Sequence, residues 1–112
     1  AHGTGTPLND IAEARALRRA LGPSADAVAV SSIKGAVGHL MAASGALELA
    51  ASLLAFERDL LPGTAHHLER DPACDLDVIG PAPRHARVDA VLSNSFGFGG
   101  QNASVILGRY AP

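Results

Sequence analysis

Residues 40–56 read Leu-Met-Ala-Ala-Ser-Gly-Ala-Leu-Glu-Leu-Ala-Ala-Ser-Leu-Leu-Ala-Phe, an apolar run in which Glu48 is the only charged residue. Its length and composition predict a helix over about 39–57. A helix that is apolar on every face is normally buried, so we expect this one inside a layered protein. The run falls short of about 20 clean apolar residues, so we do not expect it to span a membrane.

Shorter elements flank this helix. Asp10 and Glu13 have the spacing of a capping box, which predicts a helix with Asp10 as its N-cap. Gly22-Pro23 should end this helix. Residues 27–31 are apolar and predict a buried strand, and further strands are predicted at 76–79, 88–93 and 103–107. The remainder of 58–87 is Pro-rich and irregular. This order of elements indicates an α/β fold with a mixed sheet.

The bulk composition limits the classes of function. The 112 residues fit one domain, and the net charge of −2 argues against nucleic acid or an anionic membrane as partner. Cys74 is the single cysteine, which excludes an internal disulfide and fits a reducing, cytoplasmic location. The sequence starts at Ala1 inside a loop rich in glycine and threonine, so we expect a fragment of a longer protein.

Three segments carry most of the polar, chemistry-bearing residues. They are Ala1-His-Gly-Thr-Gly-Thr-Pro7, Ser31-Ser-Ile-Lys-Gly-Ala-Val-Gly-His-Leu40 and Asn94-Ser-Phe-Gly-Phe-Gly-Gly-Gln-Asn102. In order and spacing they resemble the C-terminal half of β-ketoacyl synthases of the elongating type. Asn9-Asp-x-x-Glu13 and Leu60-Leu-Pro-Gly-Thr64 look similar too, so the resemblance covers essentially the whole chain.

The resemblance implies that residues 1–112 form a β-ketoacyl synthase C-terminal domain. The implied fold is thiolase-like, with αβαβα layers, a mixed sheet and a buried central helix. The family nucleophile, a cysteine, belongs to the N-terminal half, which this sequence does not contain. Cys74 lies outside every matching motif. We therefore expect the isolated chain not to condense acyl groups.

The implied activity is decarboxylative Claisen condensation of a malonyl thioester with an acyl thioester in fatty acid or polyketide synthesis. Acyl carrier protein is the implied partner, because its phosphopantetheine arm carries the substrates. The resemblance also implies a homodimer in the full-length protein. It implies no cofactor and no metal.

The resemblance assigns His2 and His39 to the two catalytic histidines and Lys34 to the supporting lysine. Loss of CO₂ leaves an enolate, and each hydrogen-bond donor on its oxygen can be worth about 2.7–4 kcal/mol. His39 falls at the head of the predicted helix, where the dipole and desolvation would both disfavour an imidazolium. A neutral ring could then donate from one nitrogen.

Other residues match supporting positions. Glu48 is costly on an apolar helix unless it is paired, and we expect a Lys34–Glu48 pair that orients the histidines. By resemblance, Thr4 and Thr6 bind the phosphopantetheine arm. Phe98 matches a gate beside the acyl pocket, in a loop that Gly97 and Gly99 would allow to move. Phe96 is expected in the core.

Other classes of protein fit the sequence less well. A chain-length-factor-like partner subunit would be non-catalytic, but such partners typically lose the histidines that are present here. A thiolase proper would need a second cysteine near the chain end, and none follows Cys74. His66, His67 and His85 fit no zinc-ligand spacing. The glycine-rich stretches fit no nucleotide-binding or RNA-binding motif.

Overall fold

The computed structural model describes residues 1–110 and contains helices and strands in alternation. The helices are α1 (Pro7–Leu21), α2 (Lys34–Val37) and α3 (Ser44–Arg58), with 3₁₀ segments η1 (Gly22–Ala27), η2 (Met41–Ala43) and η3 (Phe98–Gly100). The strands are β1 (Ala29–Val30), β2 (Leu60–Leu61), β3 (Asp77–Val78), β4 (Arg84–His85), β5 (Ala90–Phe96) and β6 (Asn102–Gly108).

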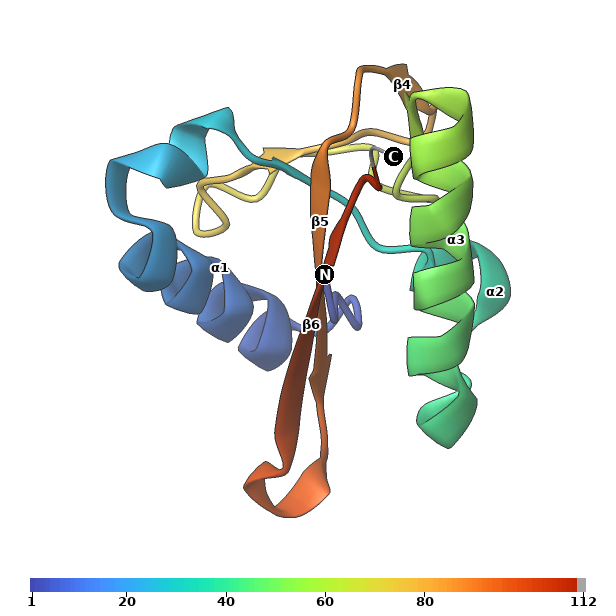
Figure 1. Cartoon of the computed structure of the whole chain (residues 1–112). Coiled ribbons are helices and arrows are strands. Elements are labelled where there is room, and N and C mark those ends of the chain that lie inside the picture. The colour runs from blue at the N-terminus through green and yellow to red at the C-terminus, as the bar shows by residue number, and fades with distance from the viewer. Residues whose placement is uncertain (111–112) are drawn as a thin grey trace.

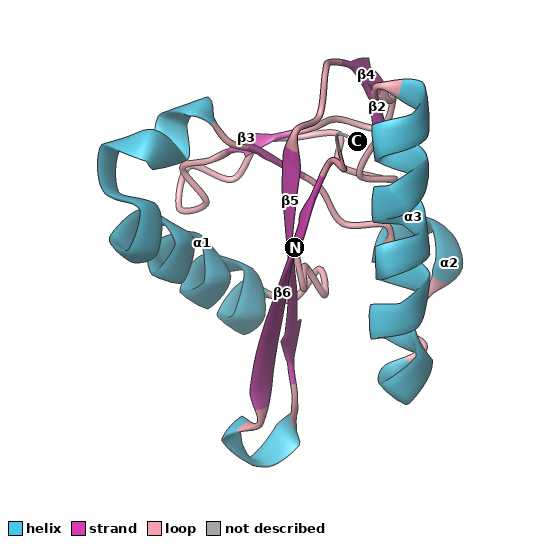
Figure 2. Cartoon of the chain, in the orientation of Figure 1, coloured by secondary structure: helices cyan, strands magenta, loops and turns pink. Residues whose placement is uncertain are grey.

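The strands pair two by two. β1 and β3 are parallel, while β2–β4 and β5–β6 are antiparallel (Figure 2). Parallel and antiparallel pairing therefore both occur, as a mixed sheet requires. Within the described residues, however, the strands form three separate two-stranded sheets, because no ladder joins β1 to β5.

The long β5–β6 hairpin stands between the two main helices (Figure 1). On one side, α1 packs against η1 and the β1–β3 region through a core of Ala14, Leu17, Ala25 and Leu76. On the other side, α3 packs on the base of the hairpin through Ala55, Phe56 and Val88. Both cores are small and mainly aliphatic, as the low aromatic content predicts.

Helix α1 begins earlier than the sequence predicted. Pro7 occupies its first turn, where the missing N–H costs nothing, and Thr6 is the extended residue before it. The prediction of Asp10 as N-cap is therefore wrong, since Asp10 lies inside the first turn. Its carboxylate instead accepts a hydrogen bond from the Gly5 N–H at 3.2 Å.

Helix α3 begins later than the sequence predicted. The segment before it contains Gly38 at φ 78° and Met41 at φ 50°, and left-handed backbone of this kind cannot continue a right-handed helix. The short helix α2 ends before these residues, and α3 starts at Ser44. His39 therefore lies in a connecting turn rather than at the head of the long helix.

The expectation that α3 is buried on all sides is also not met within the described residues. The hairpin and β2 cover one face, where Ala55 and Phe56 are buried. Leu53 and Leu54 on the remaining surface are 60% and 51% exposed, because no described element packs there. The helix is thus apolar all round but covered only in part.

The strand predictions hold better than the helix boundaries. The strands expected at 76–79, 88–93 and 103–107 correspond to β3, β5 and β6, and the one expected at 27–31 is the shorter β1. The two-residue strands β2 and β4 were missed, since each lies in the Pro-rich segment and has no alternating pattern. None of the helices among residues 1–110 is both long and apolar enough to cross a lipid bilayer.

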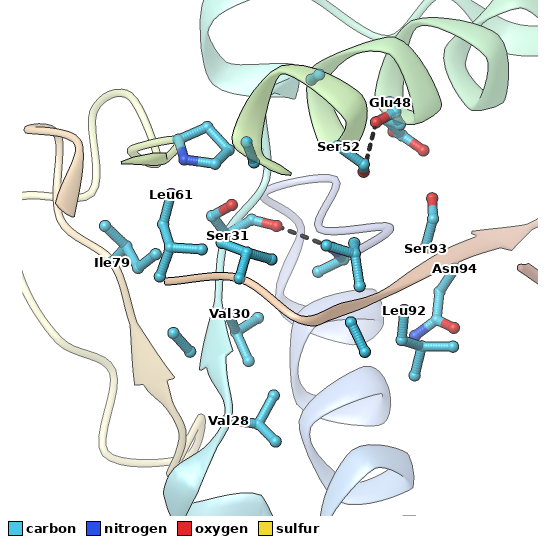
Figure 3. A pocket seen from close by; sticks show the side chains of 18 of the residues that line it. Val28, Val30, Ser31, Glu48, Ser52, Leu61, Ile79, Leu92, Ser93 and Asn94 are labelled. Carbon is cyan, nitrogen blue, oxygen red and sulfur yellow. Dashed lines mark hydrogen bonds between the residues drawn. The ribbon is translucent and has the colours of Figure 1, made fainter. Parts of the chain in front are cut away.

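A hollow of about 390 Å³ opens between β1 and β5. Figure 3 shows Val28 just before β1, Val30 of β1 and Leu92 of β5 lining it, with Glu48 of α3 at one end. Its lining is mostly aliphatic. Of the lining residues, Glu48 also pairs with Lys34 and Asn94 also contacts Glu13, so the hollow reaches the polar residues near the predicted histidines.

Candidate active site

The two predicted histidines meet in space. The ring centroids of His2 and His39 are 5.5 Å apart, and the planes are nearly perpendicular at 83°. His2 is buried, whereas His39 is exposed. One ring is thus fixed in the protein interior and the other faces the surface beside it, so a small group could contact both.

The backbone of the His2 loop is held by Glu13 of α1. Its carboxylate accepts the His2 N–H at 2.9 Å and the Gly3 N–H at 2.8 Å. Glu13 is only 4% exposed and also accepts a hydrogen bond from the Asn94 side chain at 3.3 Å. The sequence indicated Glu13 as a helix-capping residue, but the structure uses it to anchor the histidine.

Ser32 holds the same loop from the other side. Its hydroxyl donates to the Gly3 carbonyl at 2.8 Å and accepts the Lys34 N–H at 3.3 Å. Gly3 has φ +42°, and a Cβ there would lie 2.6 Å from the Ser32 Cβ. A side chain at position 3 would therefore push the His2 loop away from the Lys34 segment.

Lys34 and Glu48 form the predicted ion pair between α2 and α3. Both side chains are buried, at 5% and 11% exposure. One Glu48 oxygen contacts the ammonium, and the other, Oε2, has no hydrogen-bond partner among the described residues. The pair places the Lys34 ammonium close to the histidines. It also joins the segment that carries His39 to α3.

The tautomer of His39 follows from its contacts. The Met41 N–H lies 3.1 Å from His39 Nδ1, and the Ser44 hydroxyl lies 3.2 Å from the same atom. A backbone N–H can only donate, so Nδ1 must be the unprotonated nitrogen of a neutral ring. The proton is then on Nε2, and His39 presents a hydrogen-bond donor. The turn before α3 thus favours a neutral His39 ring that donates from one nitrogen, an effect that was expected from the helix dipole.

His2 has a different electrostatic setting. Burial lowers the pKa of its ring below the ordinary value of 6.5, and the positive charge of Lys34 lowers that pKa further, against an opposing effect of Glu13. The ring packs on Phe96 with centroids 5.4 Å apart. Its Nδ1 is buried without a partner among the described residues, which leaves Nε2 as the nitrogen free to contact a ligand.

The lowered pKa of His2 makes a prediction about pH. Between that pKa and 6.5 the folded state binds fewer protons than the unfolded state, so this contribution to stability rises with pH and is complete above about 6.5. In the full-length protein, the NMR titration midpoint of the His2 ring should lie below 6.5. A midpoint at or above that value would contradict the neutral, buried ring.

Thr4, Thr6 and Phe98 form no described hydrogen bond or ring contact with either histidine. The hydroxyls of Thr4 and Thr6 are hydrogen-bonded to each other at 2.9 Å near the surface. Phe98 is 95% exposed at the tip of the hairpin, between Gly97 and Gly99. The aromatic ring against His2 is that of Phe96, which the sequence assigned to the core.

Within residues 1–110 no group of three or more His, Cys, Asp or Glu side chains has an arrangement suited to an ion. His66 and His85 are exposed, and Cys74 lies beside the α1 core with a pKa raised by burial. Burial of this kind disfavours the thiolate.

Comparisons with known proteins agree with this arrangement. Residues 1–68 match the family model described as beta-ketoacyl synthase, C-terminal domain. The chain is 46% identical over 110 residues to 3-oxoacyl-[acyl-carrier-protein] synthase 2 of Synechocystis sp., which covers 98% of this chain and 26% of that protein. It is 50% identical over 109 residues to the tetracenomycin polyketide synthase ketoacyl synthase alpha subunit of Streptomyces glaucescens, covering 97% and 26%.

Solved structures give the same result. A type II polyketide synthase acyl-carrier protein in complex with its ketosynthase matches with a TM-score of 0.94 and 33% identity, over 98% of this chain and 27% of that one. The chain thus spans about a quarter of the length of the relatives it matches. Its fold is the thiolase-like fold of ketosynthases, and the chain belongs to the β-ketoacyl synthase family.

Proposed function

We propose that this chain supplies the decarboxylating half of a 3-oxoacyl-[acyl carrier protein] synthase active site. The single observation that supports the proposal is the meeting of His2 and His39 at 5.5 Å, one ring buried and the other exposed beside it. Two neutral imidazoles side by side can donate to one oxygen. That arrangement suits a reaction in which negative charge develops on a thioester carbonyl.

The proposed reaction begins with cleavage of the bond between the malonyl carboxylate carbon and its α-carbon. CO₂ leaves and the electron pair moves into the thioester, which becomes an enolate. The Nε2–H groups of His39 and His2 donate to the enolate oxygen. The α-carbon then attacks an acyl thioester held by a cysteine outside these 112 residues, and the cysteine thiolate leaves.

The neighbouring residues have supporting roles in this proposal. The Lys34–Glu48 pair orients the segment that carries His39, since the ammonium and the turn share one short stretch of chain. Thr4 and Thr6 lie two and four residues after His2 and bind the phosphopantetheine arm. Phe98, flanked by Gly97 and Gly99, acts as the gate of the acyl pocket.

The proposed substrate is malonyl carried on acyl carrier protein, for fatty acid or polyketide synthesis. Support comes from the relatives, which include a fatty-acid-type synthase and a polyketide ketosynthase, and from a neighbour solved with its carrier protein. We further propose that residues 1–112 act as one domain of a cytoplasmic homodimer that needs no cofactor or metal.

A second candidate is a non-catalytic chain-length-factor-like subunit. It would shape the pocket of a heterodimer without forming an acyl-enzyme. The donor geometry of His39, fixed by the Met41 N–H, favours the catalytic candidate because a non-catalytic subunit has no need of it. The residue at the nucleophile position upstream decides between them: cysteine for the enzyme, glutamine for the partner.

The proposal is tested with the full-length protein and malonyl-acyl carrier protein labelled in the free carboxylate. We expect release of labelled CO₂ and, with an acyl primer, formation of a 3-oxoacyl product by mass spectrometry. A protein that releases CO₂ only through a co-purified partner would support the chain-length-factor role. Absence of both products with a correctly folded, acylated protein would refute the enzyme.

A further inference from the structure

We propose that Asn94 is a positioning residue for His2 and that it acts through Glu13. The inference rests on the proposed function, because the reaction is what makes the position of His2 matter. Asn94 lies in β5, far along the chain from both residues. The structure connects the three by one continuous line of hydrogen bonds.

The connection begins on β6. The Ser104 hydroxyl donates to Asn94 Oδ1 at 2.8 Å, across the register that places these two residues opposite each other. On the other side Asn94 Nδ2 donates to Glu13 Oε1 at 3.3 Å. A carboxylate can only accept, so the contact with Glu13 fixes which end of the amide is the donor, and Oδ1 is left to accept from Ser104.

Glu13 passes this constraint to the catalytic loop. The same Oε1 that accepts from Asn94 also accepts the His2 N–H, and Oε2 accepts the Gly3 N–H. Glu13 and Asn94 are 4% and 6% exposed. Water therefore has little access to replace a lost donor, and a buried carboxylate needs every one it has. Asn94 fixes the carboxylate, and the carboxylate fixes the backbone that carries the His2 ring.

The same strand also contacts the ring itself. Phe96, two residues beyond Asn94 and on the same face of β5, packs against His2 with centroids 5.4 Å apart. The hairpin thus holds His2 at two points, the backbone through Glu13 and the ring through Phe96. A shift of β5 along its length would move both points together, and with them the donor nitrogen.

The test uses the full-length enzyme and two variants, Asn94→Ala and Ser104→Ala. We expect Asn94→Ala to lower the kcat of malonyl decarboxylation by roughly tenfold or more, because a small misplacement of a catalytic group is costly. Ser104→Ala should have a smaller effect in the same direction. Acylation of the nucleophile should change little. The melting temperature of Asn94→Ala should fall, because the buried Glu13 carboxylate loses a donor, so the two rates are compared at a temperature where every variant is folded. Ser95→Ala is the matched control: it lies on the opposite face of β5, close to Gly45 of α3.

A double-mutant cycle with Glu13→Gln tests the route of the effect. If Asn94 acts through Glu13, Asn94→Ala should add almost nothing in the Glu13→Gln background. Full additivity would overturn the route, and equal losses of decarboxylation and acylation would indicate a merely structural residue. Either result contradicts the proposal.

The failure of this inference can be separated from that of the proposed function. Absence of decarboxylase activity in the wild-type protein would refute the proposed function. The inference is then decided by NMR of the His2 ring, whose resonances should shift in Asn94→Ala and not in Ser95→Ala. Unshifted His2 resonances in Asn94→Ala would overturn the inference whatever the activity of the enzyme.

Discussion

In the full-length enzyme, His39→Ala is expected to lower the rate of malonyl decarboxylation by about 10²–10³-fold while acylation of the nucleophile persists. The Met41 N–H and the Ser44 hydroxyl hold Nδ1 of His39, so Nε2–H is the donor available to the enolate oxygen. Acylation produces no enolate and does not need this donor. Labelled CO₂ release measures the first step, and mass spectrometry of the acyl-enzyme measures the second.

The control for this variant is His85→Ala, since His85 is exposed on β4 and is outside the site. It should leave both steps unchanged. Unchanged decarboxylation in His39→Ala would remove the role assigned to this residue. A loss of acylation as large as the loss of decarboxylation would show that His39 serves the whole site rather than the enolate.

The second large effect concerns stability. Lys34→Ala in the full-length enzyme is expected to lower the free energy of unfolding by about 3–5 kcal/mol, because it leaves the Glu48 carboxylate buried without its partner. Glu48 Oε2 already has no described partner, so in the variant neither carboxylate oxygen would have a described side-chain partner. Urea denaturation followed by circular dichroism measures the change where unfolding is two-state, and the melting temperature serves otherwise.

Arg87→Ala is the matched control, because the Arg87–Asp89 pair is 72% and 70% exposed and should contribute little. The double variant Lys34→Met/Glu48→Leu should recover most of the lost stability but not the catalytic rate. A Lys34→Ala enzyme as stable as the control would show that Glu48 is adequately solvated or paired in the full-length protein.

The sequence predicted the residues that meet in the site better than the residues that hold them in place. His2, His39, Lys34 and Glu48 were singled out by motif and by the cost of a lone charge on an apolar helix, and the structure brings all four together. Glu13 and Asn94 were missed as site residues. Their roles depend on contacts between α1, the His2 loop and β5, and no local pattern in the sequence shows such contacts.

The error in the predicted start of α3 has a physical cause. Periodicity shows that residues 39–57 prefer a helix, but it does not show where left-handed residues interrupt it. Met41 at φ 50° has no sequence signal of the kind that glycine provides. The result matters for function, since the interruption moves His39 off the helix and supplies the backbone donor that selects its tautomer.

Phe96 and Phe98 illustrate a limit of matching by resemblance. Phe96 ends β5 whereas Phe98 lies beyond it in the turn η3, and the structure places Phe96 against His2 and leaves Phe98 exposed. The prediction of Phe98 as a gate concerns movement of the hairpin tip. It is compatible with a mobile exposed ring and stays a prediction.

The central claim is that both imidazoles donate to one thioester oxygen, and a crystal structure of the full-length enzyme with a non-decarboxylating malonyl thioester analogue tests it most directly. We expect the analogue's carbonyl oxygen within about 2.7–3.2 Å of Nε2 of both His2 and His39. An oxygen held by backbone N–H groups instead, with either ring beyond hydrogen-bonding distance, would contradict the account.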